Sequence, residues 1–253
     1  MSLIPPAELI KSVGVGIHTP EDVIGEYKRV GGFIFNSLQN LAGLTPTSDV
    51  LDVGCGTGRV AVPLTSFLTS GSYNGFDIVK DSIDWCNDAF AEYDNFNFTH
   101  VDIHSKYYNE SASQLAEEFT FPFDDAQFDL IWSSSLFTHM LIHGVDNYLS
   151  EMARVLRKGG MIWNSYLLLD ERSEPLVLGP RNDGRRMRFP VDGGRIGWKE
   201  SPEWVTGLYH ERVIELHEKH GFEIVDTKMS NWSGGRPLIK FKGQDIIVAR
   251  KTG

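Results

Sequence analysis

The sequence has little of several features that mark common classes of protein. Only 2 of its 253 residues are cysteine, Cys55 and Cys86. Two cysteines are too few for the disulfide framework of a small secreted domain, so we expect a reducing, cytoplasmic location. No apolar run reaches the roughly 18 residues of a membrane helix, and the N-terminus lacks the basic and apolar segments of a signal peptide. The sequence therefore predicts no membrane partner.

Positive charge is scarce as well. The chain has 24 Lys and Arg against 34 Asp and Glu, which gives a net charge of -10. A protein that binds nucleic acid normally presents a basic face, so we expect no nucleic-acid partner. The hydrophobic content of 41% is enough for a sizeable core, and the length suits a single α/β domain. A cationic cofactor is compatible with this composition.

Glycine, in contrast, is concentrated in one short segment, Val50-Leu-Asp-Val-Gly-Cys-Gly-Thr-Gly-Arg-Val60. The segment predicts a buried strand, a glycine-rich turn and a helix that begins near Thr57. Glycines at 54, 56 and 58 allow the backbone to approach a ligand, because no Cβ stands in the way, and the helix N-terminus then points at that ligand. The dinucleotide fingerprint G-x-G-x-x-G needs a third glycine where this chain has Arg59. This departure counts against a nicotinamide-dependent reductase.

The pattern Asp-x-Gly-x-Gly-x-Gly, from Asp52 to Gly58, resembles that of class I S-adenosylmethionine (SAM) methyltransferases. The resemblance implies that the loop of Gly54, Cys55, Gly56 and Gly58 passes under the methionine and ribose of SAM. It also implies that Asp52 helps to hold the methionine ammonium group. Three further stretches resemble a bacterial group of these enzymes that act on small molecules or glycans, at residues 77–86, 135–140 and 153–160. Together the matches cover about residues 26–163.

Acidic residues end the next two expected strands. Asp77 follows Asp52 by 25 residues, where a doubly wound fold places an acid against ribose hydroxyls. By resemblance, Asp102 receives the adenine amino group, and Ile78 and Ile103 form apolar walls for the ring. The alternative is that Asp77 is a solvated strand end and that Asp102 caps a loop.

Strands and helices alternate along most of the chain. The expected strands cover residues 49–53, 72–77, 96–101, 128–133, 161–169, 222–229 and 244–251. The expected helices cover residues 19–42, 57–68, 82–93, 145–156 and 204–220, with a break considered at Gly31-Gly32 and a glycine cap at Gly159-Gly160. This order predicts an α/β fold with a doubly wound, mostly parallel sheet and an antiparallel terminal hairpin, Rossmann-like as in class I methyltransferases.

We expect one methyltransferase domain over residues 1–253. Residues 1–47 form its N-terminal helical cap, in which Tyr27 either closes over SAM or simply packs on the sheet. Residues 170–203 form an acceptor-binding insertion or lid. The arginines of this insertion either recognise a phosphate or carboxylate on the acceptor or pair with the acidic body or a dimer partner. Trp198, Trp204 and Tyr209 are able to stack on a sugar or an aromatic acceptor. The oligomeric state is not decided, and a dimer is compatible with the sequence.

The segment from Ser133 to Met140 follows a buried strand and carries the chemistry that we expect. Ser133 lies at the carboxyl edge of the sheet, where ligands of open α/β folds bind, and we assign it to the cofactor site. Ser133-Ser-Ser-Leu136 stands where amino-methylating DNA enzymes carry an Asn/Asp-Pro-Pro-aromatic tetrad, which argues against a nucleobase substrate. We expect His139 to be a general base for a hydroxyl acceptor. The alternative is that His139 only caps the next helix.

Other residues are weaker candidates. Asp170, with Glu171, is able to serve as a base, to bind a sugar hydroxyl or to hold Mg²⁺. His210 begins a helix and is a second acid–base candidate. A zinc site at His139 and His143 lacks the glutamate of H-E-x-x-H and a third ligand, so we predict no metal site, and Mg²⁺ stays without support.

The sequence therefore predicts an enzyme that methylates a hydroxyl of a small polar molecule or glycan with SAM, and the acceptor is compatible with an anionic group. The alternatives are an N- or carboxyl-methyltransferase of a small metabolite and a SAM-binding protein without transferase activity. Catalysis in such enzymes depends mainly on the alignment of the methyl group and the nucleophile. The residue types alone therefore leave the acceptor atom open.

Overall fold

The computed structural model describes residues 2–12, 20–181, 184–236, 238 and 243–253. Contacts between residues divide the chain into two compact units. The first unit covers residues 1–101 and 128–132, and the second covers residues 102–127 and 133–253.

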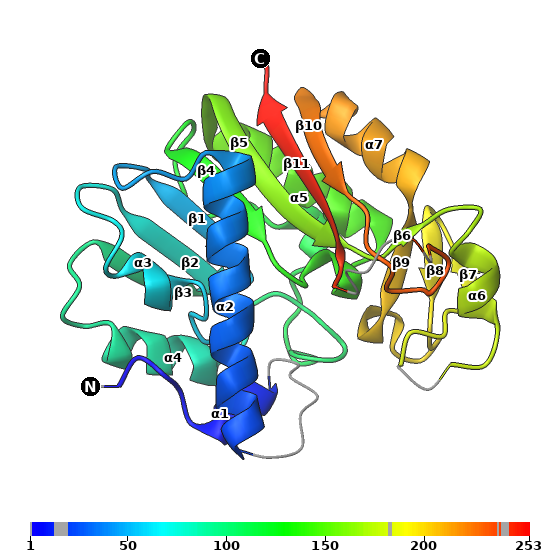
Figure 1. Ribbon diagram of the computed structural model, residues 1–253, viewed down its shortest axis with the longest axis horizontal. Coiled ribbons are helices and arrows are strands. Elements are labelled where there is room, and N and C mark those ends of the chain that lie inside the picture. The colour runs from blue at the N-terminus through cyan, green and yellow to red at the C-terminus, as the bar shows by residue number, and fades with distance from the viewer. Residues whose placement is uncertain (1, 13–19, 182–183, 237, 239–242) are drawn as a thin grey trace. The chain divides into compact units, whose positions relative to one another are not determined.

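Four parallel strands form the sheet of the first unit, in the order β4-β1-β2-β3 (Figure 1). The strands are β1 (Val50–Val53), β2 (Tyr73–Asp77), β3 (Phe96–His100) and β4 (Phe128–Ser133). All four residues of β1 are buried, which is typical of a central parallel strand that is covered on both faces. The four predicted strands are therefore present, with bounds that differ by at most one residue.

The helices of the first unit are α1 (Ala7–Ser12), α2 (Pro20–Ala42), α3 (Ala61–Leu64) and α4 (Lys80–Ala89). The long helix α2 packs against α1 and α3. The predicted break at Gly31-Gly32 is wrong, because α2 continues through both residues. A Cβ at Gly31 would lie 2.5 Å from the carbonyl oxygen of Arg59, so this glycine allows α2 to approach the segment before α3. The helix start predicted at Thr19 lies outside the described residues.

Helix α3 is much shorter than the predicted helix over 57–68. Gly56 and Gly58 have φ angles of +53° and +72°, and left-handed residues cannot belong to a right-handed helix. Residues 57–60 therefore form turns, and the helix begins only at Ala61.

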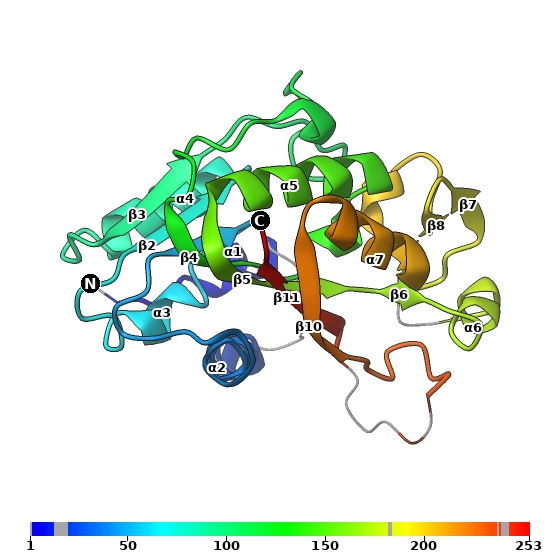
Figure 2. The ribbon, with the colours of Figure 1, turned by 90° about the horizontal axis from the view of Figure 1, so that it is seen from above.

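The second unit contains an antiparallel sheet in the order β10-β11-β5, with β5 (Leu156–Tyr166), β10 (Phe222–Lys228) and β11 (Asp245–Lys251). The terminal pair β10 and β11 confirms the predicted antiparallel hairpin. Helices α5 (Ile142–Val155) and α7 (His210–Lys219) contact each other and lie on one side of these strands (Figure 2). Two short 3-10 helices, η1 (Ala116–Glu118) and η2 (Phe137–His139), precede α5.

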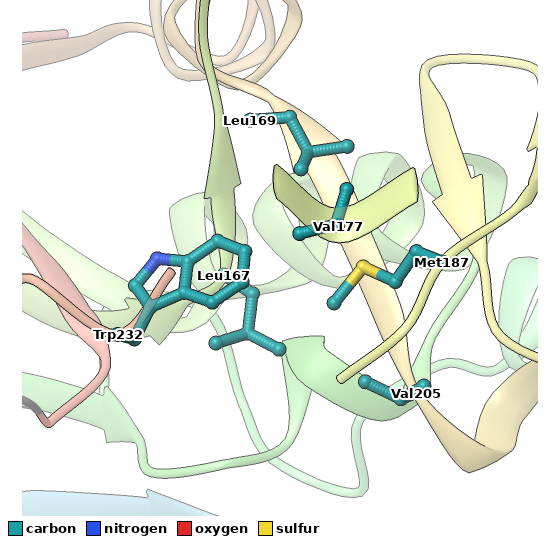
Figure 3. Close-up of a cluster of buried hydrophobic side chains, with 6 residues drawn as sticks. All are labelled: Leu167, Leu169, Val177, Met187, Val205 and Trp232. Carbon is teal, nitrogen blue, oxygen red and sulfur yellow. The ribbon is translucent and has the colours of Figure 1, made fainter. Parts of the chain in front are cut away.

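A second sheet in this unit has the order β6-β9-β8-β7. Its strands are β6 (Leu168–Leu169), β7 (Phe189–Val191), β8 (Gly194–Ile196) and β9 (Thr206–Tyr209), and α6 (Glu174–Leu178) and η3 (Pro202–Trp204) accompany them. The small core beneath this sheet is shown in Figure 3 and consists of Leu167, Leu169, Val177, Met187, Val205 and Trp232. The stretch 170–203 thus has regular structure and a core, which its irregular sequence did not indicate.

Two further boundaries differ from the predictions. The predicted helix over 204–220 begins only at His210. Residues 205–208 are buried, and 206–209 form strand β9, which pairs with β8 and β6. The predicted glycine cap at Gly159-Gly160 is also wrong. Helix α5 ends where the buried Leu156 adopts an extended backbone (φ -82°, ψ 137°), so β5 begins five residues earlier than predicted.

Candidate functional site

The glycine loop follows β1 in the first unit. Gly54, Gly56 and Gly58 all have positive φ angles, at +76°, +53° and +72°. Side chains rarely tolerate this region, so glycine is required at each of these three positions. The N–H groups of Gly54 and Cys55 donate to the carbonyl oxygen of Phe76 on β2, at 2.9 and 3.0 Å. The loop is therefore held against the neighbouring strand before any ligand binds.

Asp52 lies on β1 and is buried, with 3% of its surface exposed. The hydroxyl of Tyr73 donates to its carboxylate at 3.0 Å. Gly75 faces Asp52 in the sheet register, and a Cβ on Gly75 would lie 2.8 Å from the Tyr73 hydroxyl. Burial raises the pKa of Asp52 to about 7, although the Tyr73 hydrogen bond opposes this rise. A buried, partly protonated carboxyl group of this kind is suited to meet a cation.

Asp77 ends β2 and is half-buried. Its two carboxylate oxygens accept the N–H groups of Gly56 and Val79, each at 2.8 Å. Burial raises the pKa of Asp77, and these N–H groups oppose the rise. Asp77 thus fixes the middle of the glycine loop, a role that its position at the strand end alone did not predict.

Tyr27 and two thiols surround the same loop. The Tyr27 hydroxyl donates to the carbonyl oxygen of Thr57 at 2.8 Å, so α2 supports the loop. Cys55 and Cys86 are free and buried, and burial raises the pKa of both thiols. Both are therefore neutral packing residues and not nucleophiles.

Asp102 and Ile103, expected at the adenine ring, begin the second unit. They follow Val101, whose N–H group donates to the carbonyl oxygen of Asp77 at 3.1 Å. Asp102 is exposed and accepts the Asn109 side-chain amide at 2.9 Å, whereas Ile103 is buried. Ile78, the other expected wall, is half-buried in the first unit. Their roles at the adenine ring stay predictions.

His139 ends the 3-10 helix η2, which follows β4 after a few residues. Its Nδ1 lies 2.8 Å from the carbonyl oxygen of Glu203. A carbonyl oxygen only accepts hydrogen bonds, so Nδ1 carries the proton and Nε2 holds the free lone pair. Burial lowers the pKa of His139. The imidazole is therefore neutral at pH 7, with Nε2 able to accept a proton.

Ser133 does not present a free hydroxyl, since its Oγ donates to Asn164 on β5 at 2.8 Å. Asp170 is also engaged, because it forms an ion pair with Arg236 at 2.8 Å and accepts the N–H group of Ser173 at 2.7 Å. Burial works to raise the pKa of Asp170, but the hydrogen bonds from Arg236 and Ser173 outweigh it and lower the pKa to about 2. Such an ionised, paired carboxylate is a weak base.

His210 begins α7, and its Nε2 is buried without a hydrogen-bond partner among the described residues. Two arginines of the insertion are used within the second unit. Arg181 donates to the carbonyl oxygens of Trp232 and Ser233, and Arg195 pairs with Glu174 at 3.1 Å. These contacts favour the structural interpretation of both arginines over recognition of an acceptor anion.

Two features are absent from the part of the chain that the structure describes. No group of three or more His, Cys, Asp and Glu side chains there is arranged to hold a metal ion. No helix there is long and apolar enough to cross a membrane. The cellular location stays a prediction.

Sequence reasoning missed three residues that shape these sites: Tyr73, Glu203 and Tyr108. Tyr73 could have been found from nearby residues, because it lies two residues before Gly75 on β2, and β2 pairs with β1, the strand that carries Asp52. Glu203 reaches His139 across 64 positions of the sequence, and Tyr108 packs edge to face on His139 at 5.8 Å. No sequence pattern links such distant residues.

A parallel sheet with a left-handed glycine loop after its first strand and an acid at the end of the next strand defines the Rossmann-like fold of class I methyltransferases. Comparison with known proteins agrees: residues 51–164 match the model of the methyltransferase domain family. The predicted fold class is therefore confirmed, and the family match, which covers less than half of the chain, supports a class I SAM-dependent methyltransferase together with the solved structures of this fold. SAM is accordingly its cofactor.

Individual relatives are distant. The chain is 23% identical over 204 residues to an uncharacterized methyltransferase of Schizosaccharomyces pombe, covering 68% of this chain and 70% of that one. It is 27% identical over 152 residues to the 27-O-demethylrifamycin SV methyltransferase of Amycolatopsis mediterranei, covering 58% of this chain and 48% of that one. It thus spans about half the length of the second relative.

Among solved structures, the chain is similar to the 1,6-didemethyltoxoflavin-N1-methyltransferase of Burkholderia thailandensis, whose structure contains S-adenosylhomocysteine. The TM-score is 0.56 at 17% identity, over 90% of this chain and 79% of that one. At this identity the likeness concerns the fold alone.

Proposed function

We propose that the enzyme transfers the methyl group of SAM to a hydroxyl group of a small polar molecule or a glycan. The observation that carries this proposal is the state of His139, a neutral imidazole whose Nδ1 is fixed by the Glu203 carbonyl at 2.8 Å. A free hydroxyl is a poor nucleophile at neutral pH and gains from a base that removes its proton. A neutral amine needs no such base, so this histidine favours an oxygen acceptor.

The residues present fit the cofactor that the family requires. When bound, SAM supplies a methyl group on a positively charged sulfur, activated for displacement. The backbone of the three left-handed glycines gives close access to a ligand, and the buried Oγ1 of Thr57 in the same loop has no hydrogen-bond partner among the described residues. We assign Asp52 to the ammonium group and Asp77 to the ribose hydroxyls. The remaining assignments are Ile78, Asp102 and Ile103 to the adenine, Ser133 to cofactor binding and Tyr27 to closure over SAM.

The named relatives support both kinds of acceptor atom. The name of the Amycolatopsis enzyme refers to an oxygen position, and that of the Burkholderia enzyme refers to a nitrogen. N-methylation is thus the main alternative.

The test uses SAM labelled with ¹³C in its methyl group and a panel of sugars, phenols, amines and carboxylic acids. Carbon–proton NMR of the products separates O-methyl, N-methyl and methyl ester groups. His139→Asn keeps an N–H donor for the Glu203 carbonyl but has no basic nitrogen, so kcat is expected to fall by about 10²–10⁴-fold. His143→Asn is the matched control, because His143 is exposed and pairs only weakly with Asp192, at 3.4 Å.

Affinity for SAM is expected to be unchanged in both variants. Products that carry only N-methyl groups would contradict the proposal, as would a His139→Asn enzyme that keeps its rate on hydroxyl acceptors. Binding of SAM without any methylated product across the panel would favour the alternative of a SAM-binding protein without transferase activity.

A further inference from the structure

Three exposed aromatic side chains come together in the second unit from two distant stretches of sequence. Tyr107 lies 4.6 Å from Trp204, and Trp204 lies 5.7 Å from Trp198, as measured between ring centroids. Both pairs pack edge to face, and the three rings are 44%, 42% and 42% exposed. Single exposed aromatic residues need no explanation, but a contiguous exposed group is typical of a binding surface. We call Tyr107, Trp198 and Trp204 the aromatic platform.

Hydrogen bonds join the two stretches of sequence that carry the platform. The carboxylate of Glu203, the residue before Trp204, accepts the Ser105 hydroxyl and the Lys106 N–H group, each at 2.7 Å. The loop that carries Tyr107 is closed by a bridge between Ser105 and Asn109. Hydrogen bonds to a carboxylate are stronger than those between neutral groups. The two stretches are therefore fixed to each other without any ligand.

The platform adjoins the base that we proposed above. Glu203 contributes its carboxylate to the platform and its backbone carbonyl to His139 Nδ1. Tyr108 packs edge to face on both neighbours, at 4.4 Å from Tyr107 and 5.8 Å from His139. Glu203 and Tyr108 therefore link the platform to the imidazole.

We propose that the platform binds the sugar ring of a neutral glycoside acceptor, so that one of its hydroxyl groups meets His139. This inference rests on the proposed function. A sugar ring has an apolar C–H face and a polar rim, so it is able to lie on an exposed aromatic surface while its outer hydroxyls stay in water. A flat aromatic acceptor gains more from an enclosed apolar pocket, in which most of its surface is buried.

The charge around the platform argues against a cationic ligand. Aromatic groups bind quaternary ammonium ions through cation–π attraction, which a free carboxylate nearby would strengthen. Glu203 is the carboxylate that contacts the loop of Tyr107, and its Oε2 already accepts two hydrogen bonds, whereas the exposed Glu200 directly follows Lys199 in the sequence. Two cationic side chains, Lys199 and Arg188, contact the ring of Phe189 in the adjoining strand β7, and Lys199 directly follows Trp198. A neutral ring therefore fits better than a cation.

The experiment measures binding and turnover separately with the full-length chain. Saturation-transfer NMR with methyl glucoside, methyl galactoside and methyl rhamnoside reports binding, with phenol and choline as comparison ligands. Trp198→Leu and Trp204→Leu are each expected to weaken glycoside binding, and to raise the KM for the glycoside, by about tenfold. Trp204→Phe keeps an aromatic face and is expected to lose at most about threefold. Val225→Ala, on β10, is the control for loss of an exposed apolar side chain and is expected to have no effect.

The outcomes separate this inference from the proposed function. Glycoside binding that is lost in both Trp→Leu variants, without methyl transfer to any hydroxyl, supports the platform and contradicts the proposed function. Methyl transfer to glycosides with an unchanged KM in both variants overturns the platform and leaves the proposed function in place. Binding of phenol or choline but of no glycoside also overturns the platform. Circular dichroism and SAM affinity check that each variant is folded.

Discussion

Gly58, the last glycine of the loop, allows a quantitative test of why the loop needs glycine. Its φ angle is +72°, and an added Cβ would lie 3.3 Å from Cys86 Sγ, 3.3 Å from Phe90 Cε2 and 3.4 Å from Phe98 Cε1. A left-handed alanine costs about 1–2 kcal/mol, and crowding of a packed core costs about 1–3 kcal/mol more. Gly58→Ala is therefore expected to lower the free energy of unfolding by roughly 2–5 kcal/mol.

Gly43 is a matched control in the same unit. Its φ angle is +70°, but an added Cβ would meet nothing within 4 Å, so Gly43→Ala has the backbone cost alone, about 1–2 kcal/mol. Gly32→Ala, inside α2 and equally open, is expected to stabilise the protein by about 0.5–1 kcal/mol. Thermal and urea unfolding measure all three, and Gly58→Ala is expected to lower Tm by roughly 5–15 °C. Equal losses for Gly58→Ala and Gly43→Ala would refute the packing argument.

Three further predictions concern charged groups. Burial raises the pKa of Asp52 to about 7 in the folded protein. The contribution of this group to the free energy of unfolding is therefore fully present below about pH 4 and is lost as the pH rises through about 7. Asp52→Asn should then raise Tm at pH 8 but not at pH 4, and should weaken SAM binding in calorimetry. Burial lowers the pKa of His139 from 6.5, so kcat should fall only below pH 6.5, where the imidazole becomes protonated. His139→Asn should remove this fall at low pH from the pH–rate profile. Arg236→Met leaves the fully buried Asp245 without its cation and should lower the free energy of unfolding in urea by about 3–5 kcal/mol. Removal of the exposed Arg212, which pairs with Glu215, should lower it by less than about 1 kcal/mol.

The proposed SAM site, with its glycine loop and two acids, could be predicted from the sequence because the residues that determine it are close together in the chain. Asp52 lies two residues before the first of three glycines with positive φ angles, and Asp77 is the last residue of the next strand. Each of these features lies within a few residues of the pattern that predicts it. The antiparallel hairpin at the C-terminus was predictable for the same reason, since two successive strands have no helix between them.

The proposed acceptor site around His139 could not be predicted in the same way, because tertiary contacts between distant residues determine it. Glu203 meets Ser105 across 98 positions and His139 across 64 positions of the sequence. Residues 204–209 were expected to begin a helix, but they form a 3-10 turn and a strand in which Val205 and Leu208 are buried. Val, Thr and Tyr favour strands, so the local composition agrees with the structure and not with the predicted helix.

The contacts of Asp170 show why the nature of a residue alone is a weak guide to its role. Arg236 joins Asp170 to the fully buried Asp245, which also accepts the N–H groups of Leu168 and Ser230 and the indole N–H of Trp232. This network connects the start of the insertion to the segment before β11. A carboxylate held in this way has a low pKa and a structural partner, whereas His139 has a neutral ring and a free Nε2 lone pair. The same comparison of partners, applied to the proposed acceptor site, is the reason why we propose His139 as the base and Glu203 as the residue that positions it.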